Sequence, residues 1–343
     1  MARTAFVTGA SGFVGANVVR ALLAEGWTVR ALVRGDALSL EGLPIERVAG
    51  DLFAPSLADA MTGCDALFHL AARYSLWHRD REEVARTNVV GTRNVFAAAR
   101  RAGVPRAVHT SSVAAIGVRS DGTPADETHQ SSRDALVGAY KRSKYDAELE
   151  ARAAIAAGLD VVIVNPTTPI GPWDAKPTPT GEIIVRFLSG RMPAYVDTGL
   201  NVVDVEEVAA GHLAAYARGT TGERYILGNE NLSLRSLLER LSALTGLPAP
   251  SLRLPRLVPL AYAALGEFVF ARAGYRPDVA YEGVRMAKQM MYYDATKATR
   301  ALAVPHRPLA PALSRAVAWF QQHGYAPSAG LPEDTWRSLS SKS

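Results

Sequence analysis

The sequence predicts an α/β fold in which helices cover both faces of a parallel sheet, followed by a smaller C-terminal domain. The first observation is the alternation of short apolar segments with amphipathic segments from Thr4 to Asn165, as repeated strand–helix–strand units require. The second is a glycine-rich turn between the first apolar segment and the first amphipathic one. The third is a change of composition near Trp173, where loops rich in proline and glycine begin.

Composition and charge exclude several classes of protein. The chain has 343 residues, of which 48% are hydrophobic and 21% are charged, enough for one large and one smaller domain. Its single cysteine, Cys64, excludes an internal disulfide and a multi-cysteine zinc site, and no metal is expected. The net charge of +5 is dispersed along the chain, so no nucleic-acid partner is predicted. With a first strand at Thr4 and no membrane-spanning apolar run, we expect a cytoplasmic protein.

The turn after the first strand has the chemistry of a dinucleotide-binding loop. It reads VTGASGFVG over residues 7–15, between an apolar strand and a helix predicted from Phe13 to Glu25. Gly9 permits the tight turn, Gly12 lets a pyrophosphate approach the backbone, and Gly15 lets the helix lie close to the strand. The free N–H groups at the helix start then face the phosphates. We predict cofactor contacts from Gly9, Ser11, Gly12, Phe13, Val14 and Gly15.

The end of the second predicted strand bears on the choice of cofactor. Residues 29–33 read as a strand that ends at Arg34, and Asp36 follows two residues later. A basic residue at this point suits the 2′-phosphate of NADP, whereas an acidic residue binds the ribose 2′-hydroxyl of NAD. The order favours NADP over NAD. The alternative is that Arg34 is an ordinary solvated loop residue.

The fourth predicted strand, residues 65–72, leads into aromatic residues. Its exit is formed by small residues that let the ribose and pyrophosphate of a cofactor lie against the backbone. We interpret His69 as a packed core histidine, because no second metal ligand stands at a suitable spacing. Ligands of open α/β sheets bind outside the carboxyl ends of the strands. Tyr74 and Trp77 therefore either line the substrate pocket or pack the loop.

A tyrosine and a lysine four residues apart carry the catalytic signal. Tyr140 and Lys144 open a predicted helix and lie on one face of it. Hydride transfer needs an acid or a base for the substrate oxygen, and a nearby ammonium lowers a tyrosine pKa from its usual value of about 10. Tyr293 and Lys297 fit the same pattern. The order along the chain favours Tyr140, which follows a strand exit at Ser112 and precedes another strand.

These motifs resemble the extended short-chain dehydrogenase/reductase superfamily, through the spacing Gly-x-x-Gly-x-x-Gly and the pair Tyr140 and Lys144. The resemblance implies that Ser112, in the exit TSSVAAIG, is the third catalytic residue and contacts the substrate. It implies that Lys144 binds the nicotinamide ribose, and that Asp51 and Leu52 lie against the adenine. Further implied contacts are Leu70, Ala71, Ala72, Thr110, Asn165, Pro166 and Thr168 with the cofactor and Pro169 with the substrate.

A closer resemblance covers residues 3 to about 326. The segment NPTTPIGP at 165–172 looks like dihydroflavonol reductase and hydroxysteroid dehydrogenase relatives more than like UDP-sugar epimerases. The segments YKRSK, KPTPTG and GRMPAYVDTGL resemble the bacterial hopanoid-associated sugar epimerase family, which implies a role in hopanoid biosynthesis more firmly than a reaction. Many nucleotide-sugar enzymes of the superfamily carry an arginine before the strand that returns to the large domain. Leu200 and Asn201 stand there instead.

Three functions remain open. The first is an NADP-dependent reductase or dehydrogenase acting at a secondary alcohol or ketone carbon of a polyol, sugar-like or lipid-linked substrate, such as a hopanoid side chain. The second is a sugar epimerase that retains its NAD(P) and shows no net redox change. The third is a non-catalytic protein that senses NADP. The intact set of Ser112, Tyr140 and Lys144 argues against the third.

Domain boundaries and assembly follow from the same patterns. We expect an NAD(P)-binding Rossmann domain over residues 1–172 with a returning segment at about 200–228, a substrate-binding domain over 173–199 and 229–330, and a frayed tail over 331–343. The apolar residues 257–273 are interpreted as a buried helix, with an interfacial helix and peripheral membrane association as the alternative. Apolar faces on the helices at about 83–101 and 138–157 predict a homodimer.

Overall fold

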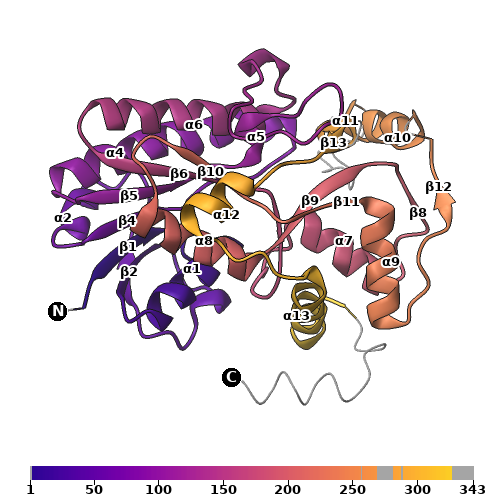
Figure 1. The fold of residues 1–343 in the computed structure, drawn as a ribbon, viewed down its shortest axis with the longest axis horizontal. Coiled ribbons are helices and arrows are strands. Elements are labelled where there is room, and N and C mark those ends of the chain that lie inside the picture. The colour runs from indigo at the N-terminus through magenta and orange to yellow at the C-terminus, as the bar shows by residue number, and fades with distance from the viewer. Residues whose placement is uncertain (1, 256, 269–280, 287–288, 327–343) are drawn as a thin grey trace.

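A seven-stranded parallel sheet forms the larger domain of the computed structural model, which describes residues 2–255, 257–268, 281–286 and 289–326 (Figure 1). The strands lie in the order β10-β6-β5-β4-β1-β2-β3, and all neighbouring pairs are parallel. The order reverses between β1 and β4, the place where dinucleotides bind in doubly wound folds. The strands are β1 Thr4–Thr8, β2 Thr28–Val33, β3 Glu46–Ala49, β4 Ala66–His69, β5 Arg106–Thr110, β6 Asp160–Pro166 and β10 Arg224–Leu227.

Helices cover both faces of this sheet, so the predicted fold class is confirmed. Because side chains alternate along a strand, Val7 and Phe68 belong to one apolar core while Phe6 and Leu67 belong to another. The first core is covered by α1 Phe13–Ala24, α8 Val205–Arg218 and α12 Thr296–Leu302. The second is covered by α2 Leu57–Met61, α4 Gly91–Arg101 and α6 Ala139–Ala156.

The helix expected at 83–101 is divided into three consecutive segments. These are α3 Arg81–Ala85, a π-helical segment η3 Arg86–Val90, and α4. Single turns of π-helix are rare and often lie at functional sites. The remaining short helices of the larger domain are η1 Leu38–Leu40, η2 His78–Asp80, α5 Val113–Ile116 and η4 Arg133–Ala135.

The smaller domain has its own sheet and core. β9 Gly199–Asp204 pairs in parallel with β7 Thr168–Ile170 and β13 Met290–Met291, and antiparallel with β11 Glu230–Ser233. β8 Ala194–Tyr195 pairs with β12 Leu252–Arg253. The helices are α7 Pro179–Leu188, α9 Leu234–Thr245, α10 Leu257–Phe268, α11 Tyr281–Met286 and α13 Leu309–Gln322. Of the returning segment, β9 therefore lies in the small sheet, and only α8 and β10 rejoin the large one.

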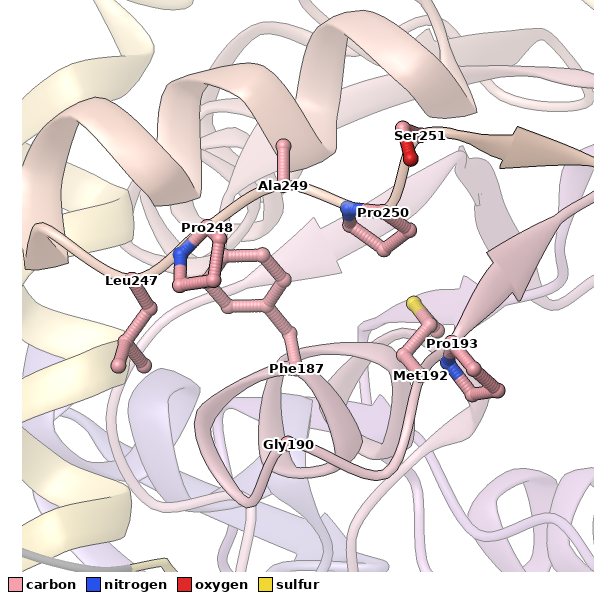
Figure 2. Close-up of a pocket in the computed structure, with 9 residues that line it drawn as sticks. All are labelled: Phe187, Gly190, Met192, Pro193, Leu247, Pro248, Ala249, Pro250 and Ser251. Carbon is pink, nitrogen blue, oxygen red and sulfur yellow. The ribbon is translucent and has the colours of Figure 1, made fainter.

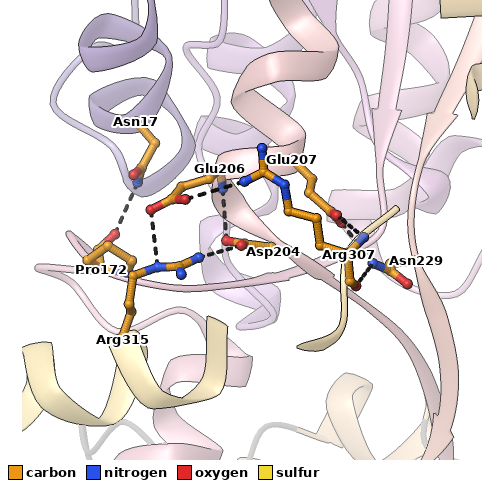
Figure 3. Close-up of polar contacts among 8 residues, drawn as sticks. All are labelled: Asn17, Pro172, Asp204, Glu206, Glu207, Asn229, Arg307 and Arg315. Carbon is orange, nitrogen blue, oxygen red and sulfur yellow. Dashed lines mark hydrogen bonds and ion pairs between the residues drawn. The ribbon is translucent and has the colours of Figure 1, made fainter. Parts of the chain in front are cut away.

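Ion pairs and hydrogen bonds join the two domains at the N-terminus of α8 (Figure 3). The buried carboxylate of Asp204 accepts a hydrogen bond from the Glu206 backbone N–H at 3.0 Å and pairs with Arg315 of α13. Arg315 also pairs with Glu206 at 3.1 Å. On the other side, Asn17 of α1 donates to the Pro172 carbonyl at 3.0 Å. These contacts fix the second domain against the helix that follows the glycine-rich turn.

The C-terminal segments agree with the sequence analysis in part. The predicted closing helix is α13. The expectation of a buried helix at 257–273 fails for the first turn of α10, where Leu257 is 75% exposed and Val258 is 52% exposed, although Ala263 is buried. Residues 269–273 and the tail 331–343 lie outside the described residues. In the part of the chain that the structure describes, no helix is long and apolar enough to cross a membrane.

Candidate active site

The glycine-rich turn has no room for side chains. Gly9 has a φ of +72°, and a Cβ there would lie 2.5 Å from the Ala71 backbone nitrogen. A Cβ on Gly15 would collide with the Gly9 carbonyl oxygen. Gly12 is the N-cap of α1 and offers no side-chain hydrogen bond, so no cap side chain competes for the first N–H groups of the helix. This cradle fits a pyrophosphate, whose oxygens accept hydrogen bonds from such groups.

The loop is held by its neighbours on both sides. The Ser39 hydroxyl donates to the Ser11 carbonyl at 2.9 Å. The backbone N–H of Leu70 donates to the Thr8 carbonyl at 3.1 Å, and that of Ala71 to the Thr8 hydroxyl at 3.3 Å. The exit of β4 therefore lies directly against the turn.

Arg34 stands exposed immediately after β2. Among the described residues it has no hydrogen-bond or ion-pair partner, whereas Asp36 pairs with Arg47 at 3.0 Å. Both charged groups at this strand end are exposed, and Arg34 is the one without an ion-pair partner among the described residues. Asp51 is exposed and accepts a hydrogen bond from the Phe53 backbone N–H at 2.8 Å, and Leu52 is buried.

The three predicted catalytic residues converge where β5 ends and α6 begins. Ser112 follows β5 and caps α5, with its hydroxyl oxygen accepting from the Ala114 N–H at 3.1 Å. The Tyr140 hydroxyl lies near the Ser112 side chain. Lys144 lies one helical turn further and donates from Nζ to the Thr110 carbonyl at 2.9 Å. Serine and tyrosine hydroxyls placed together in this way can both reach one substrate oxygen.

Burial moves the pKa values of Tyr140 and Lys144 in opposite directions. It raises the pKa of Tyr140 to about 12, and the nearby Ser112 side chain opposes that shift. It lowers the pKa of Lys144 to about 8, and the carboxylate of Glu148 opposes that shift. We expected Lys144 to hold the tyrosine pKa down; in this structure burial outweighs any such effect, and Lys144 Nζ donates to the Thr110 carbonyl. Tyr140 is thus a neutral phenol at pH 7, a proton donor.

Tyr74 lies beside the catalytic tyrosine. Its ring meets that of Tyr140 edge-on, with 4.6 Å between the centroids, and the side chain is 44% exposed. Trp77 is half-buried, and its backbone N–H donates to the Ser75 hydroxyl at 3.2 Å. Of the two aromatic candidates, the structure brings Tyr74 into contact with Tyr140.

Asn88, in the π-helical segment, holds the loop that carries Tyr74. Its side chain accepts from the Arg73 N–H at 2.7 Å and donates to the Arg73 carbonyl at 3.0 Å and to the Ser143 hydroxyl at 2.8 Å. It therefore ties the loop to α6 between Tyr140 and Lys144. The sequence analysis missed this role, because a polar residue inside a helical pattern gives no signal for a π turn.

The second tyrosine–lysine pair is used differently. Tyr293 precedes α12, whereas Lys297 lies within it and pairs with Glu223 at 2.6 Å. The buried Tyr293 hydroxyl donates to the Val113 carbonyl at 3.4 Å. The two side chains do not share a helical face, so the local structure supports the choice of Tyr140.

Asn165 is fully buried and directed into the protein. Its amide donates to the Ser112 carbonyl at 3.0 Å and to the Glu148 carboxylate at 2.7 Å. A cofactor contact from this residue would come from its backbone. Pro166 ends β6, and Thr168 and Pro169 lie half-buried on β7, so both prolines stand in strands.

His69 is a core histidine, as interpreted from the sequence. It is hydrogen-bonded to Thr8 at 2.7 Å and to Thr92 at 2.9 Å, and burial lowers its pKa to about 3. Within the described ranges, no three His, Cys, Asp or Glu side chains gather in a way that could hold a metal ion.

Comparison with known proteins decides the family. The NAD dependent epimerase/dehydratase family matches residues 5–228, which run from β1 to just past β10. The chain belongs to this family. Its resemblance to extended short-chain dehydrogenases/reductases is thereby confirmed, and the protein is an NAD(P)-dependent oxidoreductase or epimerase of that type.

Several relatives within this epimerase/dehydratase family cover almost the whole chain. A Synechocystis sp. protein that carries the provisional name dihydroflavonol 4-reductase is 57% identical over 95% of this chain and 96% of its own length. Sterol demethylase protein B of Methylococcus capsulatus is 39% identical over 94% of this chain and 99% of its own length. A solved nucleoside-diphosphate-sugar epimerase from Pseudomonas aeruginosa superposes with a TM-score of 0.79 at 29% identity, covering 94% of this chain and 99% of that structure.

One cavity of the protein lies away from the catalytic residues. It has a volume of about 300 Å³ and opens between the end of α7 and the segment that follows α9 (Figure 2). Phe187 and Met192 face proline-rich residues 247–251 across it. None of the predicted site residues lines this cavity.

Proposed function

We propose that the protein is an NADP-dependent reductase that acts at a ketone carbon, with Tyr140 as the general acid. The observation that carries the proposal is the convergence of Tyr140, Ser112 and Lys144 where β5 ends and α6 begins, with Tyr140 as a neutral phenol at pH 7. Reduction of a ketone needs a proton donor at the oxygen. A protonated phenol can give its proton directly to the substrate oxygen.

Separate residues of the chain would bind the cofactor and the substrate oxygen. The glycine turn would hold the cofactor pyrophosphate, and Arg34 the 2′-phosphate, through bidentate hydrogen bonds. When bound, NADPH supplies the hydride. Ser112 and Tyr140 hold the substrate oxygen, where negative charge develops, and Tyr140 gives it a proton. The ammonium of Lys144 lies one turn below and favours the phenolate that remains.

The names of reductase relatives favour an apolar substrate. Besides the sterol demethylase protein, a 4-hydroxy-2-methyl-3-oxo-4-farnesyl-3,4-dihydroquinoline-1-oxide ketoreductase of Stigmatella aurantiaca is 34% identical over 85% of this chain. A 2-alkyl-3-oxoalkanoate reductase of Shewanella oneidensis is 31% identical over 78% of it. Sterol, farnesyl and alkyl groups are all lipid-like. We therefore propose a lipid-linked ketone, with a hopanoid side chain and its polyol or sugar-like part as the specific case, and Tyr74 as an exposed aromatic surface beside it.

The test is direct. Purified protein is mixed with NADPH or NADH and a panel of ketones that includes a 2-alkyl-3-oxoalkanoate and a short-chain analogue, while loss of reduced nicotinamide is followed by absorbance. We expect turnover with NADPH and the long-chain ketone. Absence of turnover with every ketone, together with a cofactor that stays bound through purification, would contradict the proposal.

A sugar epimerase that retains its cofactor is the second candidate. The 29% identical nucleoside-diphosphate-sugar epimerase from Pseudomonas aeruginosa supports it. Asn201 argues against a nucleotide sugar, because it stands where many nucleotide-sugar enzymes of the superfamily carry an arginine. Its side chain is buried and donates to Asn231 at 2.8 Å and to the Tyr293 carbonyl at 3.2 Å. Tightly retained NAD(P) and interconversion of a sugar without net oxidation would establish this function in place of the first.

We also propose a homodimer formed through α4 and α6. The two helices lie side by side and are tied by Arg93 and Glu150 at 2.6 Å. Apolar side chains are exposed on the same surface, where Leu149 of α6 is 50% exposed and Val90 is 38% exposed at the end of the π-helical segment. Burying such side chains in a symmetric contact removes apolar area from water.

A further inference from the structure

A buried carboxylate lies one helical turn beyond Lys144. Tyr140, Lys144 and Glu148 are spaced by four residues along α6, so the three side chains follow one face of the helix. Glu148 and Lys144 are both buried. A buried carboxylate is costly unless it is hydrogen-bonded and paired with a cation. The partners of Glu148 therefore indicate what it does.

The Glu148 carboxylate is bonded through both oxygens. One accepts from the Asn165 amide at 2.7 Å, and the other lies 3.5 Å from the buried guanidinium of Arg224. The same Asn165 amide donates to the Ser112 carbonyl at 3.0 Å. The carboxylate thus links α6, which carries Tyr140 and Lys144, to the end of β6 and the start of β10, and through Asn165 to the exit of β5 at Ser112.

We propose that Glu148 is a positioning residue of the active site. Its carboxylate keeps Lys144 protonated inside the protein and, through Asn165, fixes the backbone at Ser112 beneath Tyr140. The inference rests on the proposed roles of Tyr140 and Lys144. It adds a residue that touches neither substrate nor cofactor, since Glu148 is buried behind Asn165 and Arg224.

The groups that face Lys144 support an electrostatic role. Two of these groups lie on the same helix as Lys144: Tyr140, which is neutral, and Glu148, which is an anion. From β4 and β5, His69 and His109 face the ammonium, and burial holds the pKa of each well below its usual range, so both are uncharged at neutral pH. Burial alone lowers the pKa of Lys144, and the Glu148 carboxylate opposes that shift. Removing this charge leaves burial unopposed.

The chain offers a measurement that needs no substrate. It contains six lysines, at positions 141, 144, 176, 288, 297 and 342, so an NMR titration of protein labelled at the lysine ε-carbon gives few signals. The signal of Lys144 is assigned as the one that is missing from the spectrum of the Lys144→Met variant. We expect a Lys144 midpoint near pH 8, as its pKa indicates, and a midpoint lower by about one unit or more in Glu148→Gln. Lys297, which pairs with Glu223 at 2.6 Å, is the internal control and keeps its midpoint.

A double variant separates electrostatics from folding. Glu148→Gln leaves Arg224 buried without its carboxylate, which destabilises the protein, whereas Glu148→Gln combined with Arg224→Gln removes both charges. We expect the double variant to recover thermal stability while the Lys144 midpoint stays low. A wild-type midpoint in either folded variant would overturn the proposal, because Glu148 would then serve only to pair with Arg224.

Kinetics complete the test in the wild-type enzyme and the double variant. The ammonium of Lys144 is lost as pH rises through its pKa, so a lower pKa moves the alkaline limb of the kcat profile to lower pH, while KM stays unchanged. An unshifted limb beside a shifted NMR midpoint would overturn the link to catalysis. Absence of wild-type turnover with any ketone, with the NMR shift intact, would instead count against the proposed function and leave the role of Glu148 standing.

Discussion

Replacement of Tyr140 by phenylalanine removes one oxygen and little else. The ring keeps its edge-on contact with Tyr74, whose centroid lies 4.6 Å away. The substitution removes the phenol oxygen beside Ser112, where a hydrogen bond would contribute about 1 kcal/mol to stability on the usual scale. Loss of a general acid lowers turnover by about a hundredfold to ten-thousandfold. We therefore expect Tyr140→Phe to fold, to bind NADPH as the wild type does, and to lose nearly all turnover.

Three measurements on the same preparation check this expectation. A thermal melt reports folding, quenching of protein fluorescence reports NADPH binding, and absorbance of the nicotinamide under single-turnover conditions reports hydride transfer. Because the cofactor cradle is built from backbone at Gly9, Gly12 and Gly15, the binding curve should not move. The hydride-transfer rate alone should fall.

Tyr293→Phe is the matched control. It removes a phenol oxygen from the same sequence pattern, and the only bond at stake is the long 3.4 Å contact with the Val113 carbonyl. We expect turnover close to that of the wild type. If Tyr293→Phe abolished turnover while Tyr140→Phe kept it, the assignment of the site would be wrong, and α6 would be only a packing element.

Three further predictions concern the cofactor, stability and assembly. Arg34→Asp should lose affinity for NADPH and gain relative affinity for NADH, and equal affinities in the wild type would refute the choice of NADP. Asp174 is buried, and burial raises its pKa to about 6. Its ionisation therefore lowers the free energy of unfolding as pH rises from about 4 to about 6, by up to about 3 kcal/mol. Asp174→Asn should therefore gain stability relative to the wild type across that interval in urea titrations, and a constant difference would contradict this. Leu149→Asp should convert the proposed dimer to a monomer by light scattering, while Leu252→Asp, at a similarly exposed position, should not.

The larger domain could be predicted because its signals are local. Each strand is a short apolar segment, each glycine of the turn is required by a close backbone approach, and the carboxyl ends of parallel strands gather on one edge. The placement of β9 could not be predicted in the same way. Val202 and Val203 read equally well as a strand of either sheet, and only pairing with β7 and β11 decides between them.

The parts of the site that escaped prediction depend on contacts distant in sequence. Asn88 is fifteen residues from Arg73 and fifty-five from Ser143, yet it binds both. Asn165 was assigned to the cofactor by resemblance; its buried amide bonds to Ser112 and Glu148, which leaves its backbone for a cofactor contact. The direction of a side chain at the end of a strand depends on which neighbouring residue offers a hydrogen-bond acceptor. The spacing of residues along the sequence does not identify that neighbour.

The protonation states of Tyr140 and Lys144 at neutral pH suit the proposed ketone reduction. Burial places the pKa of Lys144 at about 8 and that of Tyr140 at about 12, so as pH rises the ammonium loses its proton before the phenol does. Oxidation of an alcohol requires a phenolate as base, and the lysine that would stabilise this phenolate is already neutral at the pH where it forms. Ketone reduction begins with both groups protonated, the state that the structure favours at pH 7.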